Sequence, residues 1–186
     1  MTTGKFRPRL IILSDLWGKE RSGWVKYYTK HLENYFEIQY YDSCELAEID
    51  ILHYNKELVH HQFINGGIDK AVKNLKIKED EKISVLAFSI GGFIAWKAMV
   101  EGLPAENLFA VSSTRLRQEI QKPRGIIQLY YAQNDTYRPT DKWFLTLNLE
   151  REIFAEEDHD FYQKQNVGKL ISQKIIQHFK NTGQFS

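Results

Sequence analysis

Three side chains of the types that cooperate in acyl transfer each follow a short strand-like segment of this chain. Ser89 and Asp135 come shortly after apolar runs at 83–88 and 126–131, and His159 follows a third such segment. A serine hydroxyl is a weak nucleophile until a base removes its proton, and a histidine oriented by a carboxylate is a suitable base. The residues therefore predict nucleophilic catalysis in which Ser89 attacks, His159 transfers the proton and Asp135 orients the imidazole.

The elements that must position these side chains alternate along the chain. Apolar or alternating stretches predict six strands, at 10–13, 36–41, 83–88, 108–111, 126–131 and 150–154. Apolar residues spaced three and four apart predict a first helix that begins near Trp24, with Ser22 as its N-cap. They predict a second helix over 58–75, with a bend at Gly66 and Gly67. Further helices are predicted at 90–100, 141–147 and 167–179. This alternation predicts an α/β fold, a mostly parallel sheet of about six strands with helices on both faces. Ligands of such sheets bind beyond the carboxyl ends of the strands, where the three side chains lie.

Length and charge narrow the class of protein. The 186 residues favour one domain over 1–186, and 26% charged with 42% hydrophobic residues is ordinary for a globular chain. A net charge of +1 argues against electrostatic binding of nucleic acid. Cys44 is the only cysteine, which excludes an internal disulfide. No apolar run is long enough for a membrane span or for the core of a signal peptide, so we expect a cytoplasmic protein. The oligomeric state stays open.

The residues around Ser89 resemble the nucleophile elbow of the α/β-hydrolase superfamily. In that turn from strand to helix, the positions two before and two after the nucleophile hold small residues, because neighbouring backbone approaches closely. Ala87 and Gly91 occupy those positions here, with Ala87 in place of the commoner glycine.

The segments around the acid and the histidine are also similar to those of the superfamily. Asp135 lies in a stretch at 132–139 that ends in proline, and His159 lies in a stretch at 158–161 in which an aspartate replaces a glycine. The resemblance extends from about residue 9 to residue 179 and depends on the three segments occurring in order.

The resemblance implies a compact serine hydrolase that needs no metal or organic cofactor. It implies hydrolysis of an ester or thioester of a small molecule through an acyl intermediate on Ser89. The oxyanion would be bound by the amides of Ile90 and of Leu16, which lies in the loop at 14–18. That loop departs from the family, since Ser14-Asp15 stands where the family has His-Gly. The chain between the fourth and fifth strands is too short for an inserted cap.

Three further residues are candidates for contact with the substrate. Asp15 and Trp17 belong to the loop after the first strand, and Arg115 follows the fourth strand, where a guanidinium suits an anionic group. Adjacent histidines, His60 and His61, point in different directions from a helix and have no third ligand nearby, so no metal site is predicted.

Simpler roles compete with these assignments. Ser89 is also in a position to cap a helix. Asp135 could be an ordinary turn residue, in which case Asp141 is the alternative acid. His159 could lie in a solvated acidic loop.

Two other functions of the whole protein are open as well. One is a non-catalytic module of the same fold that binds a small molecule or a protein. The other is a nucleotide-binding domain, although the glycines at 91–92 are not followed by the Lys and Thr of a phosphate-binding loop. Catalysis by Ser89 predicts an unusual backbone conformation at that residue.

Overall fold

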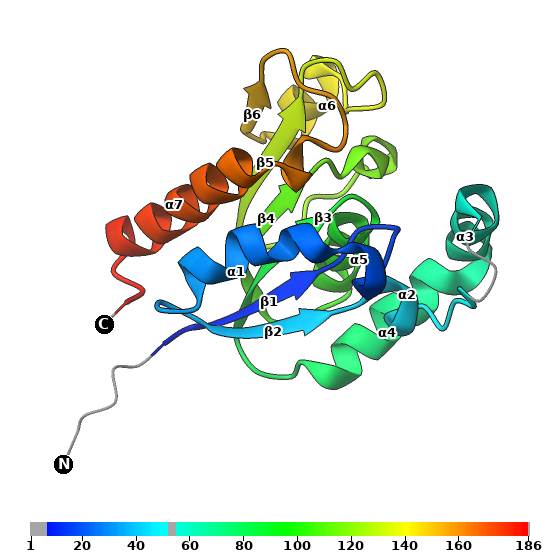
Figure 1. Ribbon diagram of the computed structural model, residues 1–186, viewed down its shortest axis with the longest axis horizontal. Helices are drawn as coiled ribbons and strands as arrows, with labels where there is room; N and C mark the ends of the chain where they lie inside the picture. Colours follow the sequence, from blue (N-terminus) through cyan, green and yellow to red (C-terminus); the bar gives the residue numbers. More distant parts are fainter. Residues whose placement is uncertain (1–6, 52–54, 186) are drawn as a thin grey trace.

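Six strands form one sheet in which every neighbouring pair is parallel. The structure is a computed structural model that describes residues 7–51 and 55–185, so most of the basic segment at the N-terminus lies outside the described residues. The sheet has the order β2-β1-β3-β4-β5-β6 (Figure 1). Its strands are β1 (Arg9–Leu13), β2 (Glu37–Tyr41), β3 (Ile83–Phe88), β4 (Ala105–Val111), β5 (Ile126–Ala132) and β6 (Arg151–Phe154). The predicted six-stranded parallel α/β fold is confirmed.

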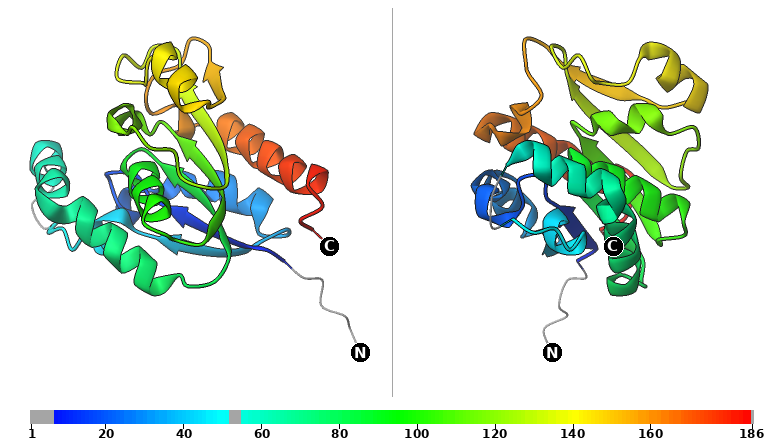
Figure 2. Two further views of the ribbon diagram at one scale, coloured as in Figure 1. Left: turned by 180° about the vertical axis from the view of Figure 1, so that it is seen from behind. Right: turned by 90° about the vertical axis from the view of Figure 1, so that its right-hand side faces the viewer.

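Helices cover both faces of the sheet. They are α1 (Lys26–Leu32), α2 (Ser43–Leu46), α3 (Lys56–Gln62), α4 (Ile68–Lys78), α5 (Ile90–Val100), α6 (Asp141–Leu147) and α7 (Gln165–Asn181). Figure 2 shows α1 and α7 on one side of the sheet and α4 and α5 on the other. The described residues also form the short helical segments η1 (Lys19–Arg21), η2 (Gly23–Val25), η3 (Phe63–Gly67), η4 (Thr114–Gln118) and η5 (Phe161–Gln163).

Alternate residues of the central strands enter two separate hydrophobic cores. In β1, Leu10 and Ile12 pack in the core under α1 and α7, whereas Ile11 and Leu13 pack in the core under α4 and α5. All six residues of β3 are buried. Because both faces of these strands are covered, their sequences are continuous apolar runs rather than alternating ones.

Two local expectations have different outcomes. The predicted N-cap at Ser22 is wrong, because this residue precedes the short turn η2 and its hydroxyl donates to the carbonyl of Gly18 over 2.6 Å. The predicted bend in the stretch at 58–75 is confirmed. Gly66 there has a φ of 106°, which breaks the helical path between α3 and α4. Glycine tolerates this backbone conformation at little cost.

The connection between β4 and β5 is short. It consists of residues 112–125, and its one element is η4. A cap domain is therefore absent from this connection, as the sequence predicts. Across residues 7–51 and 55–185, no helix combines the length and apolarity required to cross a bilayer.

Candidate active site

Ser89 occupies a strained turn between β3 and α5. Its backbone has φ 49° and ψ −115°, a conformation that residues other than glycine rarely adopt. Its side chain makes no capping hydrogen bond to α5, so the simple N-cap role does not describe it. The unusual backbone conformation predicted for Ser89 is present, and the turn presents the hydroxyl at the carboxyl edge of the sheet.

Close packing explains why glycines follow Ser89. A Cβ atom on Gly91 would lie 2.4 Å from the backbone oxygen of Ser14, and one on Gly92 would lie 1.9 Å from Oγ of Ser113. Both distances are far below van der Waals contact. The start of α5 is therefore pressed against the ends of β1 and β4. The need for glycine at position 91 is anticipated by the elbow pattern, but the need at Gly92 is visible only in the structure.

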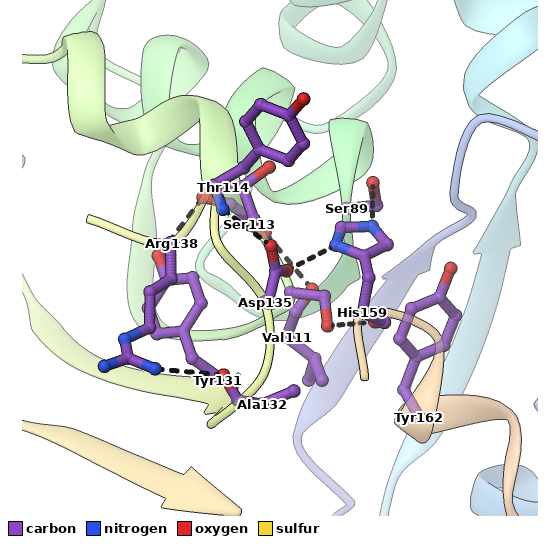
Figure 3. A network of polar contacts seen from close by, with 12 residues as sticks. Ser89, Val111, Ser113, Thr114, Tyr131, Ala132, Asp135, Arg138, His159 and Tyr162 are labelled. Carbon is purple, nitrogen blue, oxygen red and sulfur yellow. Dashed lines mark hydrogen bonds and ion pairs between the residues drawn. The ribbon is translucent and has the colours of Figure 1, made fainter. Parts of the chain in front are cut away.

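His159 connects Ser89 with Asp135 (Figure 3). Its Nε2 lies 3.3 Å from Oγ of Ser89, and its Nδ1 lies 2.6 Å from Oδ2 of Asp135. Asp135 side-chain exposure is 2%, against 42% for the imidazole. An ionised carboxylate only accepts hydrogen bonds, so Nδ1 carries the proton and Nε2 is left to accept from the serine hydroxyl. The structure thus brings the three predicted side chains together in a geometry suited to proton transfer.

The turn after β5 holds Asp135 in place. Oδ1 of Asp135 accepts the backbone N–H of Tyr137 over 3.0 Å, which leaves Oδ2 for His159. The alternative acid, Asp141, lies at the start of α6 and pairs with Arg151 at the surface over 2.7 Å. Asp135 is therefore the carboxylate that meets the histidine.

The loop that carries His159 is fixed by contacts from distant parts of the chain. Oγ of Ser112 donates to the carbonyl of His159 over 2.6 Å, and the N–H of Asn134 donates to the carbonyl of Glu157 over 2.9 Å. Glu157 also forms an ion pair with Lys164. The acidic segment around His159 is thus held against the turn after β5. The sequence does not identify Ser112 as a partner of His159, although its place at the end of β4 is a signal for a site residue.

The two amides predicted to bind an oxyanion lie on neighbouring segments. Ile90 is the first residue of α5, where a backbone N–H has no acceptor within the helix. Leu16 lies in a turn in which the N–H of Gly18 donates to the carbonyl of Asp15 over 3.4 Å. The contact between Gly91 and Ser14 places this turn beside the start of α5. The start of α5 and the loop after β1 are thus neighbours, and the assignment of the Ile90 and Leu16 amides to the oxyanion stays a prediction.

Asp15 does not face the solvent, in contrast to its predicted role in contacting substrate. It has 0% exposure, and its two carboxylate oxygens accept from the N–H of Trp17 over 2.9 Å and from Oη of Tyr162 over 2.8 Å. Burial, only partly offset by these hydrogen bonds, raises the pKa of Asp15 to about 6. The packing of Tyr162 against the loop after β1 is what removes this carboxylate from the surface.

Trp17 and Arg115, the other two residues predicted to contact substrate, are half-buried. The ring of Trp17 lies 5.5 Å from Cζ of Arg21 and 6.0 Å from Nζ of Lys56. Cζ of Arg115 lies 5.3 Å from the ring of Phe93 on α5. Within the described ranges, no three His, Cys, Asp or Glu side chains form a possible metal site, and this includes His60 and His61.

Comparison with known proteins gives structural but not sequence matches. No protein-family model and no curated protein matches the chain. Among solved structures, it is similar to MGS-MChE2, an α/β-hydrolase enzyme from the metagenome of lagoon sediments of Mar Chica, Morocco. The TM-score is 0.66 at 13% identity, over 96% of this chain and 93% of that one.

Two further neighbours have comparable scores. Est1E from Butyrivibrio proteoclasticus has a TM-score of 0.60 at 11% identity, over 96% of this chain and 91% of that one. The Vlm2 thioesterase domain with a bound dodecadepsipeptide has a TM-score of 0.61 at 10% identity, over 94% of each chain. The chain therefore has the α/β-hydrolase fold, in a compact form with a six-stranded parallel sheet.

Proposed function

We propose that this protein is a serine hydrolase that cleaves an ester or thioester of a small molecule. The observation that carries the proposal is the continuous line of contacts from Asp135 through His159 to Ser89, with Ser89 on a strained strand-to-helix turn. Strained backbone at a nucleophile costs stability and is retained where it serves function. The names of the neighbours, an α/β-hydrolase enzyme and a thioesterase domain among them, support the same reaction class.

The first half of the reaction would form an acyl-enzyme. Oγ of Ser89 attacks the carbonyl carbon while its proton passes to Nε2 of His159, and the buried carboxylate of Asp135 stabilises the resulting imidazolium. The amides of Ile90 and Leu16 donate to the oxyanion of the tetrahedral intermediate. When the intermediate collapses, the imidazolium returns the proton to the departing alcohol or thiol.

The second half would release the acid. A water molecule attacks the acyl group on Ser89 and gives its proton to His159, which then returns it to Oγ of the serine. The distance of 3.3 Å between Oγ and Nε2 suits a site without substrate, because such contacts commonly shorten in the substrate complex. The 42% exposure of the His159 side chain gives water access to the base.

The direct test is labelling with a fluorophosphonate probe, followed by identification of the modified residue. We expect the wild-type protein to be labelled on Ser89 and the Ser89→Ala variant to remain unlabelled. Ser172→Ala is the matched control, because that serine is buried in α7 with its hydroxyl donating to the carbonyl of Gly168. Asp135→Asn should lower kcat on a short-chain ester by about 10⁴-fold, as the wrong histidine tautomer does in a triad of the same geometry on another fold.

The result that would contradict the proposal is a folded wild-type protein with neither labelling nor ester turnover. That outcome would favour the alternative function, a non-catalytic module of the same fold that binds a small molecule or a protein.

A further inference from the structure

Arg115 is a half-buried cation with an unsatisfied donor. It lies in η4, shortly after the end of β4, and its Nε is buried without a hydrogen-bond partner among residues 7–51 and 55–185. Burial, followed by the charge of Arg117, lowers its pKa from the usual arginine value. A guanidinium keeps its charge in such surroundings, so an anion that accepts from it would be strongly favoured.

One contact and one short sequence separation connect Arg115 with the segments around the nucleophile. Its guanidinium lies over the ring of Phe93, which is four residues after Ser89 and therefore one turn along α5. Side chains lean toward the N-terminus of their helix, so we expect the Phe93 ring to lie toward the turn that begins at Ser89. Arg115 is also three residues from Ser112, whose hydroxyl holds the carbonyl of His159. Nε of Arg115 thus lies at the same edge of the sheet as Ser89, His159 and Asp135.

A second cation, Lys56, lies nearby on a different element. His60 on α3 has a pKa lowered by burial and by the charges of Arg115 and Lys56, which places these groups within electrostatic reach of one another. Nζ of Lys56 lies 6.0 Å from the ring of Trp17, the residue after the candidate oxyanion donor Leu16. Arg115 and Lys56 thus place two positive charges on the side of the site between the loop after β1 and η4, with Glu119 as an acidic group that acts on Arg115.

We propose that the substrate carries an anionic group, a carboxylate or a phosphate, which Arg115 binds while Ser89 attacks the ester or thioester. This inference rests on the proposed serine hydrolase function. It makes Arg115 a specificity-determining residue, since Arg presents paired donors that match the oxygens of either anion. Phe93 supplies the apolar surface next to it.

The experiment compares matched substrates. One series consists of 4-nitrophenyl half-esters of dicarboxylic acids of increasing length, each paired with the neutral ester of the same length. A second pair places the carboxylate on the leaving group instead, as the butyrate ester of 4-hydroxybenzoate against that of its methyl ester. In at least one series, wild type should favour the anionic member by about tenfold or more in kcat/KM, as expected for a hydrogen bond to a charged group.

Variants assign that preference to one residue. Arg115→Gln should abolish this preference, so that charged and neutral partners react at equal rates, and Arg115→Lys should keep part of it. Arg124→Gln, which removes an exposed positive charge of the loop before β5, should leave it unchanged. Equal rates on charged and neutral partners in both series, or equal effects of Arg115→Gln and Arg124→Gln, would overturn the proposal.

Binding to the Ser89→Ala variant separates this inference from the proposed reaction. Monomethyl glutarate should bind more tightly than methyl valerate in calorimetry, and adding Arg115→Gln should remove the difference. Tighter binding of inorganic phosphate than of monomethyl glutarate would identify phosphate as the preferred anion. If wild type has no hydrolytic activity but this binding depends on Arg115, the anion site stands and the hydrolase proposal fails. If no anion binds, the anion site is excluded whatever the activity.

Discussion

Oη of Tyr162 donates a hydrogen bond of 2.8 Å to Oδ2 of Asp15, and so joins the segment after His159 to the loop after β1. The Tyr162 ring also lies edge-on to the imidazole of His159, with 6.3 Å between the ring centres. The contact links the loop that carries the general base of the proposed mechanism to the loop that carries Leu16. Asp15 is buried, and the hydrogen bond that it accepts from Tyr162 is stronger when its carboxyl group is ionised than when it is protonated.

Removing the Tyr162 hydroxyl should therefore destabilise the protein in a pH-dependent way. Above the Asp15 pKa of about 6, Tyr162→Phe removes a hydrogen bond to a carboxylate, which should cost about 1.5–3 kcal/mol. Near pH 4.5 the partner is a neutral carboxyl group and the cost should fall to about 0.5–1.5 kcal/mol. Urea unfolding at both pH values measures the difference.

Tyr28→Phe is the matched control for that experiment. Its hydroxyl donates to the backbone carbonyl of Tyr162 over 2.8 Å, an acceptor that does not titrate. The loss of stability in Tyr28→Phe should be the same at both pH values. A pH-independent loss in Tyr162→Phe as well would show that Asp15 does not titrate in this range.

Asp15 itself should make the protein less stable as the pH rises. Its folded pKa of about 6 lies above the ordinary value of 3.8, so the folded state binds the proton more tightly than the unfolded state. The stability conferred by the protonated form is complete below pH 4 and is lost between about pH 4 and pH 6, up to about 3 kcal/mol in all.

Asp15→Asn removes this contribution because the amide does not titrate. Its carbonyl still accepts from Trp17, and its NH₂ group donates to the Tyr162 oxygen. The free energy of unfolding of Asp15→Asn relative to wild type should thus increase as the pH rises from 4 to 7. Denaturant titrations across this range measure it, and a difference that stays constant with pH would contradict the prediction.

Ser112 should act as a positioning residue for the proposed base. Its φ of 51° makes glycine the least strained replacement, so Ser112→Gly removes the 2.6 Å hydrogen bond to the His159 carbonyl without adding strain. We expect kcat on a short-chain ester to fall about tenfold with KM nearly unchanged, since small displacements of a catalytic group cost up to about 10²-fold.

Ser172→Ala serves as the comparison for Ser112→Gly, because it removes a buried serine hydroxyl that donates to a backbone carbonyl within α7. That control should lower stability and leave kcat unaltered. Equal kcat values for Ser112→Gly and wild type would exclude a positioning role.

The contact between Gly92 and Ser113 should limit substitution in the first turn of α5. Gly92→Ala places a Cβ atom 1.9 Å from Oγ and 2.8 Å from Cβ of Ser113, an overlap that should cost about 1–3 kcal/mol of stability. Adding Ser113→Gly removes both atoms and should restore part of that loss. Gly23→Ala is the control, because no atom lies within 4 Å of its added Cβ. Equal thermal stability of Gly92→Ala and Gly23→Ala would contradict the prediction.

The sequence by itself determined the strands and the edge at which chemistry is found. Buried parallel strands must be apolar on both faces, so runs such as residues 83–88 are recognisable without knowledge of their neighbours. Their carboxyl ends meet at one edge of the sheet, and for this reason Ser89, Asp135 and His159 could be grouped from position alone.

Tertiary structure decided the surroundings of those three side chains. Asp15 and Tyr162 are 147 positions apart and Ser112 and His159 are 47 apart, so no local periodicity links either pair. The burial of Asp15 and the clash that requires Gly92 arise only when helices and loops pack on the assembled sheet. Periodicity reports the secondary structure of a segment and the face it buries, whereas contacts between segments depend on how the whole chain packs.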